Sequence, residues 1–181
     1  MQYTLPKQIP VEIRRMAAAV HEAGHAVVGI MLGRPVTRAM LRQPDGLSGQ
    51  TEFEPEPAVE LDLNIPSDRN FIEDAVIVLL AGRVAEAEFW AGQRPLYNPY
   101  IDTHREDDRE IEQLVANFGF TDDERARYDS HCLARTQNYI LPAPVAAAIK
   151  EIAARLSVDL EIGRAAIDRI LSRNGVRPLG A

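Results

Sequence analysis

Cysteine is nearly absent from this chain: Cys132 is the single one among 181 residues. One cysteine cannot build an internal disulfide framework, so the sequence predicts a reducing compartment, which we take to be the cytoplasm. Cys132 follows His131 directly, but neighbours in sequence do not face each other on a helix. A cysteine-protease dyad is therefore not expected at this position.

Long apolar runs are also missing. No stretch of 18 or more apolar residues occurs, so we expect no transmembrane segment in this chain. The longest candidates are interrupted by ionisable residues such as Glu22 and Arg83. Residues 1–10 contain no apolar stretch of the signal-peptide type, and their prolines predict an extended leader.

Positive charge is scarcer than negative charge. The chain has 20 lysines and arginines against 27 aspartates and glutamates, which gives a net charge of −7. Phosphate contacts need a basic surface, so this balance argues against a nucleic-acid partner. A phosphate-cradling Gly-x-x-x-x-Gly-Lys-Ser/Thr loop is absent as well, so no nucleotide-hydrolysing module of that kind is recognisable.

The size and the hydrophobic pattern predict a single domain, 1–181, with a mainly α fold and a small β-hairpin or short sheet after the first helix. Ser67 or Asp68 is expected to cap the second helix. The predicted helices cover 11–32, 71–91, 106–118, 122–138, 145–156 and 160–173. The predicted strands cover 36–41 and 49–53, with a turn at 43–46, loops at 54–66 and 92–103, and a loose tail at 175–181.

The first predicted helix carries the segment His21-Glu22-Ala23-Gly24-His25. Positions i and i+4 stack on one face of a helix, so both imidazoles would point the same way and could hold one metal ion. Glu22 lies beside them, where it can address a metal-bound water as a general base. This spacing is the zinc-metalloprotease signature.

A plain structural interpretation competes with the metal site, namely a buried helix whose histidines are hydrogen-bonded core residues. The flanking residues 16–20 and 26–32 are apolar, which indicates a helix buried on nearly all sides. Two imidazoles and a carboxylate are costly to bury there unless they are paired or bound to a metal. The setting therefore favours the metal site.

A catalytic zinc usually takes three protein ligands and leaves one position for water. The third ligand must come from another segment, and the charged stretch 104–110 offers carboxylates and His104. Acids also suit the solvated start of a helix, so the stretch alone does not select a ligand.

The segment 20–26 resembles the active-site helix of the peptidase domain of FtsH-type ATP-dependent zinc metalloproteases. Further segments resemble parts of that domain in the same order. They are the strand at 46–53, the Gly-Arg-x-Ala-Glu helix at 75–86, the third-ligand helix at 107–120 and the closing helices at 145–156 and 160–171. The resemblance extends from about residue 11 to residue 174.

The resemblance implies that the third zinc ligand is an aspartate at a helix start, followed by apolar residues four and seven positions later. Asp107 fits this pattern, with Ile111 and Leu114 at those positions. Asp108 is the second choice, and His104 and Asp102 rank below both.

The implied activity is that of a zinc-dependent metalloendopeptidase, in which His21, His25 and Asp107 bind Zn²⁺ and Glu22 serves as the base toward a zinc-activated water. Its substrates would be unfolded proteins or peptides, which could pair with the strand at 49–53 by edge addition. Folded substrates would need a separate ATPase partner, because no ATPase module is found here. A homo-oligomer is implied by the resemblance alone.

Two other hypotheses remain open. One is a catalytically silent zinc-binding module of the same fold that acts as a regulatory or interaction partner. The other is a metal-free helical protein that carries the motif by chance.

Overall fold

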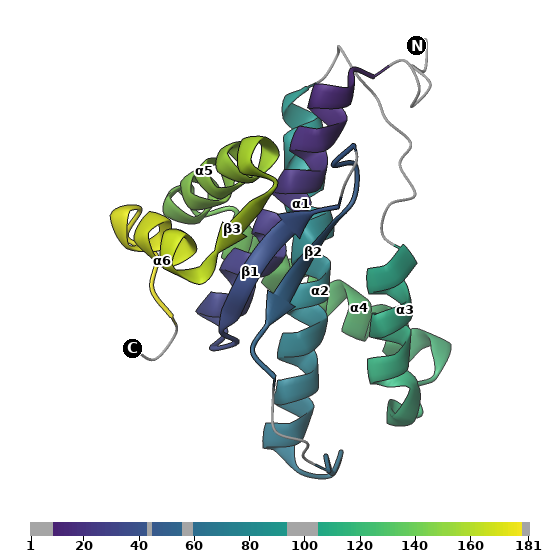
Figure 1. Cartoon of the computed structure of the whole chain (residues 1–181). Helices are drawn as coiled ribbons and strands as arrows, with labels where there is room; N and C mark the ends of the chain where they lie inside the picture. Colours follow the sequence, from purple (N-terminus) through teal and green to yellow (C-terminus); the bar gives the residue numbers. More distant parts are fainter. Residues whose placement is uncertain (1–8, 43–44, 56–59, 94–104, 179–181) are drawn as a thin grey trace.

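The computed structural model describes residues 9–42, 45–55, 60–93 and 105–178 (Figure 1). Its fold is mainly α with a small antiparallel sheet, which confirms the predicted fold class. In chain order the elements are α1 (Val11–Met31), β1 (Val36–Leu41), β2 (Gly49–Phe53), α2 (Pro66–Gly92), α3 (Arg105–Val115), a 3-10 turn (Ala116–Phe118), α4 (Asp122–Ile140), α5 (Ala143–Asp159), β3 (Glu161–Gly163) and α6 (Arg164–Arg173). The turn predicted at 43–46 falls partly on residues outside the described ranges.

Helix α1 lies at the centre of this arrangement. It packs against α2 and α5, and the sheet lies across it (Figure 1). Its residues 19–29 are all buried, as its apolar sequence predicts. Gly24 faces α2 so closely that a Cβ there would lie 2.6 Å from the Ala81 carbonyl oxygen. The missing side chain therefore lets the two helices approach.

The sheet has the strand order β2-β1-β3, with antiparallel pairing throughout. Ala39 on β1 is opposite Thr51 on β2 and Ile162 on β3. The predicted bounds of β1 and β2 agree with the structure. Strand β2 is an edge of the described sheet, and it lies on the side where α1 carries the histidine motif, since the Thr51 hydroxyl donates to the Glu22 carbonyl oxygen at 3.0 Å.

Strand β3 corrects the prediction of a helix that begins at Leu160. Leu160 has φ 62°, a left-handed conformation that ends α5. Three residues then pair with β1 before α6 begins. The pairing depends on a strand more than a hundred positions earlier, and three residues are too few to show an alternating pattern.

The start of α2 is also corrected. The helix begins at Pro66, inside the predicted loop 54–66 and before the predicted start at residue 71. Its N-cap is Ile65 and no side chain caps it, so the predicted cap at Ser67 or Asp68 is wrong. Proline at the first helical position already has the required φ and carries no N–H that needs an acceptor, which suits it to this start.

Both ends of the described chain contribute to the core. Ile9, in the predicted leader, is 2% exposed and packs with Ala17 and Trp90. Val176, in the predicted loose tail, is 7% exposed, and its N–H donates to the Leu171 carbonyl oxygen at 2.9 Å. Ile9 and Val176 are therefore held in place by their burial in the core. Residues 1–8 and 179–181 lie outside the described residues. Among the helices that the structure describes, none has the length and apolar character needed to cross a membrane.

We expect Gly24→Ala to lower the free energy of unfolding by about 1–3 kcal/mol, because the new methyl group meets a backbone oxygen of α2 that cannot rotate away. Gly92→Ala, at the end of α2, is the matched control. No heavy atom of the described residues lies within 4 Å of the place that its Cβ would take, so this change should be neutral or stabilise by up to about 1 kcal/mol. Denaturant unfolding of both variants without metal measures this difference. A Gly24→Ala variant with the same free energy of unfolding as Gly92→Ala would contradict the close helix contact.

Candidate metal centre

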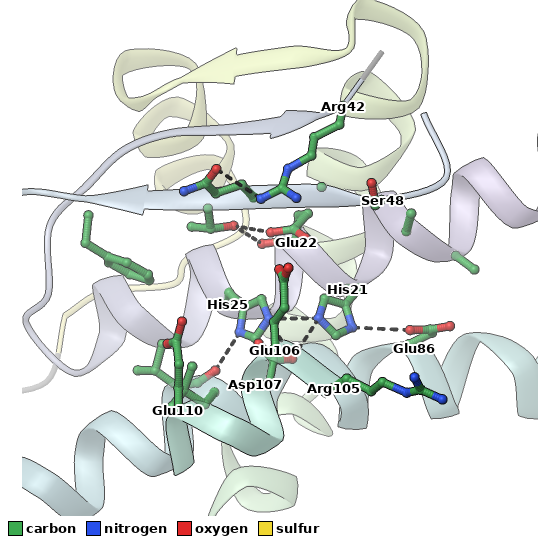
Figure 2. A pocket seen from close by; sticks show the side chains of 18 of the residues that line it. His21, Glu22, His25, Arg42, Ser48, Glu86, Arg105, Glu106, Asp107 and Glu110 are labelled. Atoms are coloured by element: carbon green, nitrogen blue, oxygen red, sulfur yellow. Dashed lines mark hydrogen bonds and ion pairs between the residues drawn. The ribbon is translucent and has the colours of Figure 1, made fainter. Parts of the chain in front are cut away.

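His21 and His25 lie one above the other on the buried face of α1 (Figure 2). Their ring centroids are 4.6 Å apart, with an interplanar angle of 77°. The two Nε2 atoms are 2.9 Å apart. The i, i+4 spacing therefore brings one nitrogen of each ring to a common point.

Asp107 on α3 completes a triangle with these two nitrogens. Its Oδ2 atom lies 3.1 Å from His21 Nε2 and 3.6 Å from His25 Nε2. Two ligand atoms held at about 2.0–2.1 Å by a tetrahedral zinc lie about 3.3 Å apart. The observed edges of 2.9, 3.1 and 3.6 Å scatter around that value, so the triangle needs only small side-chain movements to accept the ion.

The other ligand candidates differ in their surroundings. Asp108 forms an ion pair with Arg83 on α2 and does not face the histidines. Asp102 and His104 lie outside the described residues. Asp107 lies on the buried face of α3, on the same side of the helix as Ile111, which is four positions later and packs into the core. This position on the helix is what brings Asp107 next to the histidines. The assignment of a metal to this set stays a prediction.

The outer nitrogen of each ring has a partner on α2. His25 Nδ1 is 2.7 Å from the Val78 carbonyl oxygen, and because a carbonyl can only accept, the Nδ1–H donates, which directs Nε2 toward His21 and Asp107. His21 Nδ1 is 3.2 Å from Glu86 Oε2. Such partners fix the ring orientation and make the inner nitrogen a better ligand.

Glu86 is in turn held by Trp90, whose Nε1–H donates to Glu86 Oε1 at 3.0 Å. Glu86 is 4% exposed, and Trp90 is 8% exposed. The sequence motif does not predict either residue as part of the site. The signal that could have found Glu86 is its position at the end of an apolar helical run, where an unpaired carboxylate would be costly.

The charge around His21 attracts a cation. Burial of the ring opposes protonation, but the hydrogen bonds to Asp107 and Glu86 outweigh it and raise the pKa of His21 to about 10. Burial would by itself raise the pKa of Asp107, yet the two imidazoles hold that pKa below its usual range. The two carboxylates therefore favour the doubly protonated form of the His21 ring, and a metal at Nε2 would take the place of one of its protons.

Glu22 points toward the sheet, next to the ligand triangle (Figure 2). Burial is the main cause that raises the pKa of its carboxyl group, and the nearby imidazoles oppose the shift. The Thr51 hydroxyl lies 2.9 Å from Glu22 Oε2. Strand β2 crosses so close to Glu22 that a Cβ at Gly49 would lie 2.4 Å from Glu22 Cγ.

These residues line an open pocket of about 1140 Å³. Its walls come from α1, the β1–β2 hairpin, α2 and α3. Gly82 on α2 leaves space beside the rings, since a Cβ there would lie 2.4 Å from His25 Nε2 and 2.6 Å from His21 Nε2. The donor set, its orienting partners and the open space together fit a zinc ion with access for a substrate.

Comparison with known proteins supports a relationship to the FtsH zinc metalloproteases. No protein-family model matches the chain. Over 113 residues, 61% of the chain, it is 34% identical to the chloroplastic ATP-dependent zinc metalloprotease FTSH 1 of Oryza sativa subsp. japonica and 33% identical to the chloroplastic ATP-dependent zinc metalloprotease FTSH of Medicago sativa. It is 31% identical over 114 residues to the ATP-dependent zinc metalloprotease FtsH 3 of Synechocystis sp..

The chain spans 15–18% of the length of these curated relatives. The similarity therefore supports the zinc-metalloprotease relationship at the level of the family, and not the activity of the whole relatives.

Gly82→Ala tests the geometry of the centre. The added methyl group would occupy the space beside both Nε2 atoms, so we expect zinc affinity to fall by about 10–100-fold. The helix should stay folded. Competition with a chromophoric chelator measures the affinity. Gly92→Ala, on the same helix but with no described atom close to its Cβ position, should bind zinc like the wild type. Undiminished zinc binding by Gly82→Ala would show that the ion does not sit between these rings.

Proposed function

We propose that this chain is a zinc-dependent metalloendopeptidase that hydrolyses peptide bonds in unfolded proteins or peptides. The observation that carries the proposal is the triangle of His21 Nε2, His25 Nε2 and Asp107 Oδ2 with Glu22 beside it, in a pocket open to substrate. The sequence similarity to zinc metalloproteases gives independent support.

His21, His25 and Asp107 are the residues that would hold the ion. When bound, zinc lowers the pKa of water toward about 7 and polarises a carbonyl oxygen. Glu86 and the Val78 carbonyl keep the two rings in the orientation that directs Nε2 inward. An ion pair of Asp108 with Arg83 anchors α3, which carries Asp107, to α2.

Glu22 is the proton carrier in this proposal. Its carboxylate takes a proton from the attacking water and gives it to the nitrogen of the leaving amine. A pKa raised by burial suits this role, because a general base works best with a pKa close to the working pH. The Thr51 hydroxyl, whose single hydrogen is shared between Oε2 at 2.9 Å and the Glu22 carbonyl oxygen at 3.0 Å, orients the carboxylate.

An extended substrate is the class that the pocket favours. β2 is an edge strand of the described sheet and passes directly over Glu22. The backbone N–H and C=O groups on the outer side of β2 can form hydrogen bonds with an extended polypeptide. Because these bonds do not depend on side chains, substrates of many sequences could place a peptide bond near the site. A separate ATPase partner for folded substrates, a homo-oligomeric state and a cytoplasmic location stay predictions.

The test is cleavage of unfolded casein by the zinc-loaded chain and by Glu22→Gln. We expect the variant to keep its zinc and to lose activity by about 10²–10⁴-fold, because only the proton carrier is removed. Chelation should abolish cleavage by the wild type, and zinc should restore it. Glu88→Gln, a change on the surface of α2, is the matched control and should retain full activity.

Activity that survives both chelation and Glu22→Gln would overturn the proposal. A chain that holds zinc but cleaves no unfolded protein or peptide would instead establish the silent zinc-binding module.

A further inference from the structure

A cationic side chain lies on the floor of the pocket, away from the metal ligands. Arg14 precedes His21 by about two turns of α1, so the two residues lie on the same face of the helix. Both line the pocket. Between them the lining residues of α1 are Ala17 and Ala18, whose small side chains keep the floor open.

Arg14 lacks a partner among the residues that the structure describes. Its Nε atom is buried and has no hydrogen-bond acceptor, and no hydrogen bond or ion pair of its guanidinium occurs within the described ranges. Folded proteins rarely leave a buried donor unsatisfied. Arg14 as a whole is half-buried, so its Nε–H is the donor that is shut off from water, and a planar guanidinium with an unsatisfied Nε–H is shaped to bind a carboxylate. The missing acceptor is therefore expected to come from a molecule that enters the pocket.

Arg42, which follows the end of β1, is another of the four arginines among the described residues that line the pocket; the other two are Arg34 and Arg105. Within the described part of the chain, its guanidinium donates only to the neutral amide oxygen of Gln50, at 3.4 Å. Other arginines pair with carboxylates, as Arg38 does with Glu52 and Arg125 with Glu112. Arg42 is exposed, so water satisfies its guanidinium in the free protein, and what it contributes is positive charge on the sheet side of the pocket with no carboxylate partner among the described residues.

On the opposite wall, formed by α3, the acidic lining residues outnumber the basic Arg105. Figure 2 shows Glu106 and Glu110 on α3, across the pocket from Arg42 on the sheet side. Both glutamates are exposed, so water satisfies them and they do not require a ligand. They repel an anion, however, and so direct it toward α1 and the sheet.

We propose that Arg14, assisted by Arg42, binds a carboxylate of the polypeptide substrate. The proposal rests on the proposed function, because it assigns a subsite of the same pocket. Arg14 and His21 lie about 10 Å apart along α1, which corresponds to about three residues of an extended chain. The carboxylate therefore belongs to a residue roughly two to four positions from the cleaved bond, as an acidic side chain or as the C-terminal carboxylate.

The experiment measures binding without turnover. Zinc-loaded Glu22→Gln protein is titrated into fluorescent peptides of one parent sequence, with glutamate or glutamine at each of the four positions on either side of a fixed central bond. A second pair carries a free or an amidated C-terminus. We expect about tenfold tighter binding for glutamate than for glutamine at one of these positions, or for the free C-terminus than for the amidated one. The first result identifies an acidic side chain as the ligand, and the second identifies the C-terminal carboxylate.

Arginine variants in the same background identify the partner. Arg14→Gln should abolish the preference for the carboxylate, and Arg14→Lys should keep part of it, because lysine retains the charge without the Nε–H. Arg169→Gln, an exposed change of equal charge on α6, should leave the preference intact. If Arg14→Gln fails to fold by circular dichroism, Arg42→Gln and added salt take its place, and both should weaken the preference.

The outcomes separate this inference from the proposed function. Equal binding of acidic and neutral peptides, or a preference that survives Arg14→Gln, overturns the inference. Wild-type cleavage of the same peptides without a carboxylate preference overturns it as well but leaves the protease in place. An Arg14-dependent preference in binding, with no cleavage by the wild type, supports the carboxylate subsite and overturns the protease.

Discussion

The burial of two imidazoles and a carboxylate in the middle of α1 is the constraint on which the rest of this structure depends. His21, Glu22 and His25 are each less than a tenth exposed. Polar groups at that depth are tolerated only when neighbouring elements supply partners. Three elements do so here: α2 through Glu86 and the Val78 carbonyl, β2 through Thr51, and α3 through Asp107.

The close approach of those elements depends on residues without side chains. Gly82 leaves room beside the two Nε2 atoms, and Gly49 lets β2 cross directly over Glu22. A methyl group at either position would displace a functional side chain. The two glycines therefore let the neighbouring elements approach α1 and also leave space in the pocket. The same backbone contacts thus affect both the stability of the fold and the access of a ligand to the centre.

The local parts of this architecture could be predicted from the sequence. The i, i+4 histidines and the apolar residues around them determine a buried helix with one polar face, and the bounds of β1 and β2 follow from short runs between turn signals. The parts that depend on tertiary pairing could not be. β3 exists because β1 offers an edge, and Glu86 and Trp90 join the site because α2 lies alongside α1. The family resemblance favours Asp107 over Asp108, and the structure adds the physical reason, namely the buried side of α3.

The zinc content of two neighbouring variants tests the central claim most directly. Asp107→Ala and Asp108→Ala remove the same charge from adjacent positions of α3, but only Asp107 faces the histidines. Our expectation is one zinc ion per chain in the wild type and in Asp108→Ala, and a large loss of zinc in Asp107→Ala, measured by elemental analysis after dialysis against a weak chelator. Full zinc content in Asp107→Ala, or a wild-type chain that retains none, would contradict it.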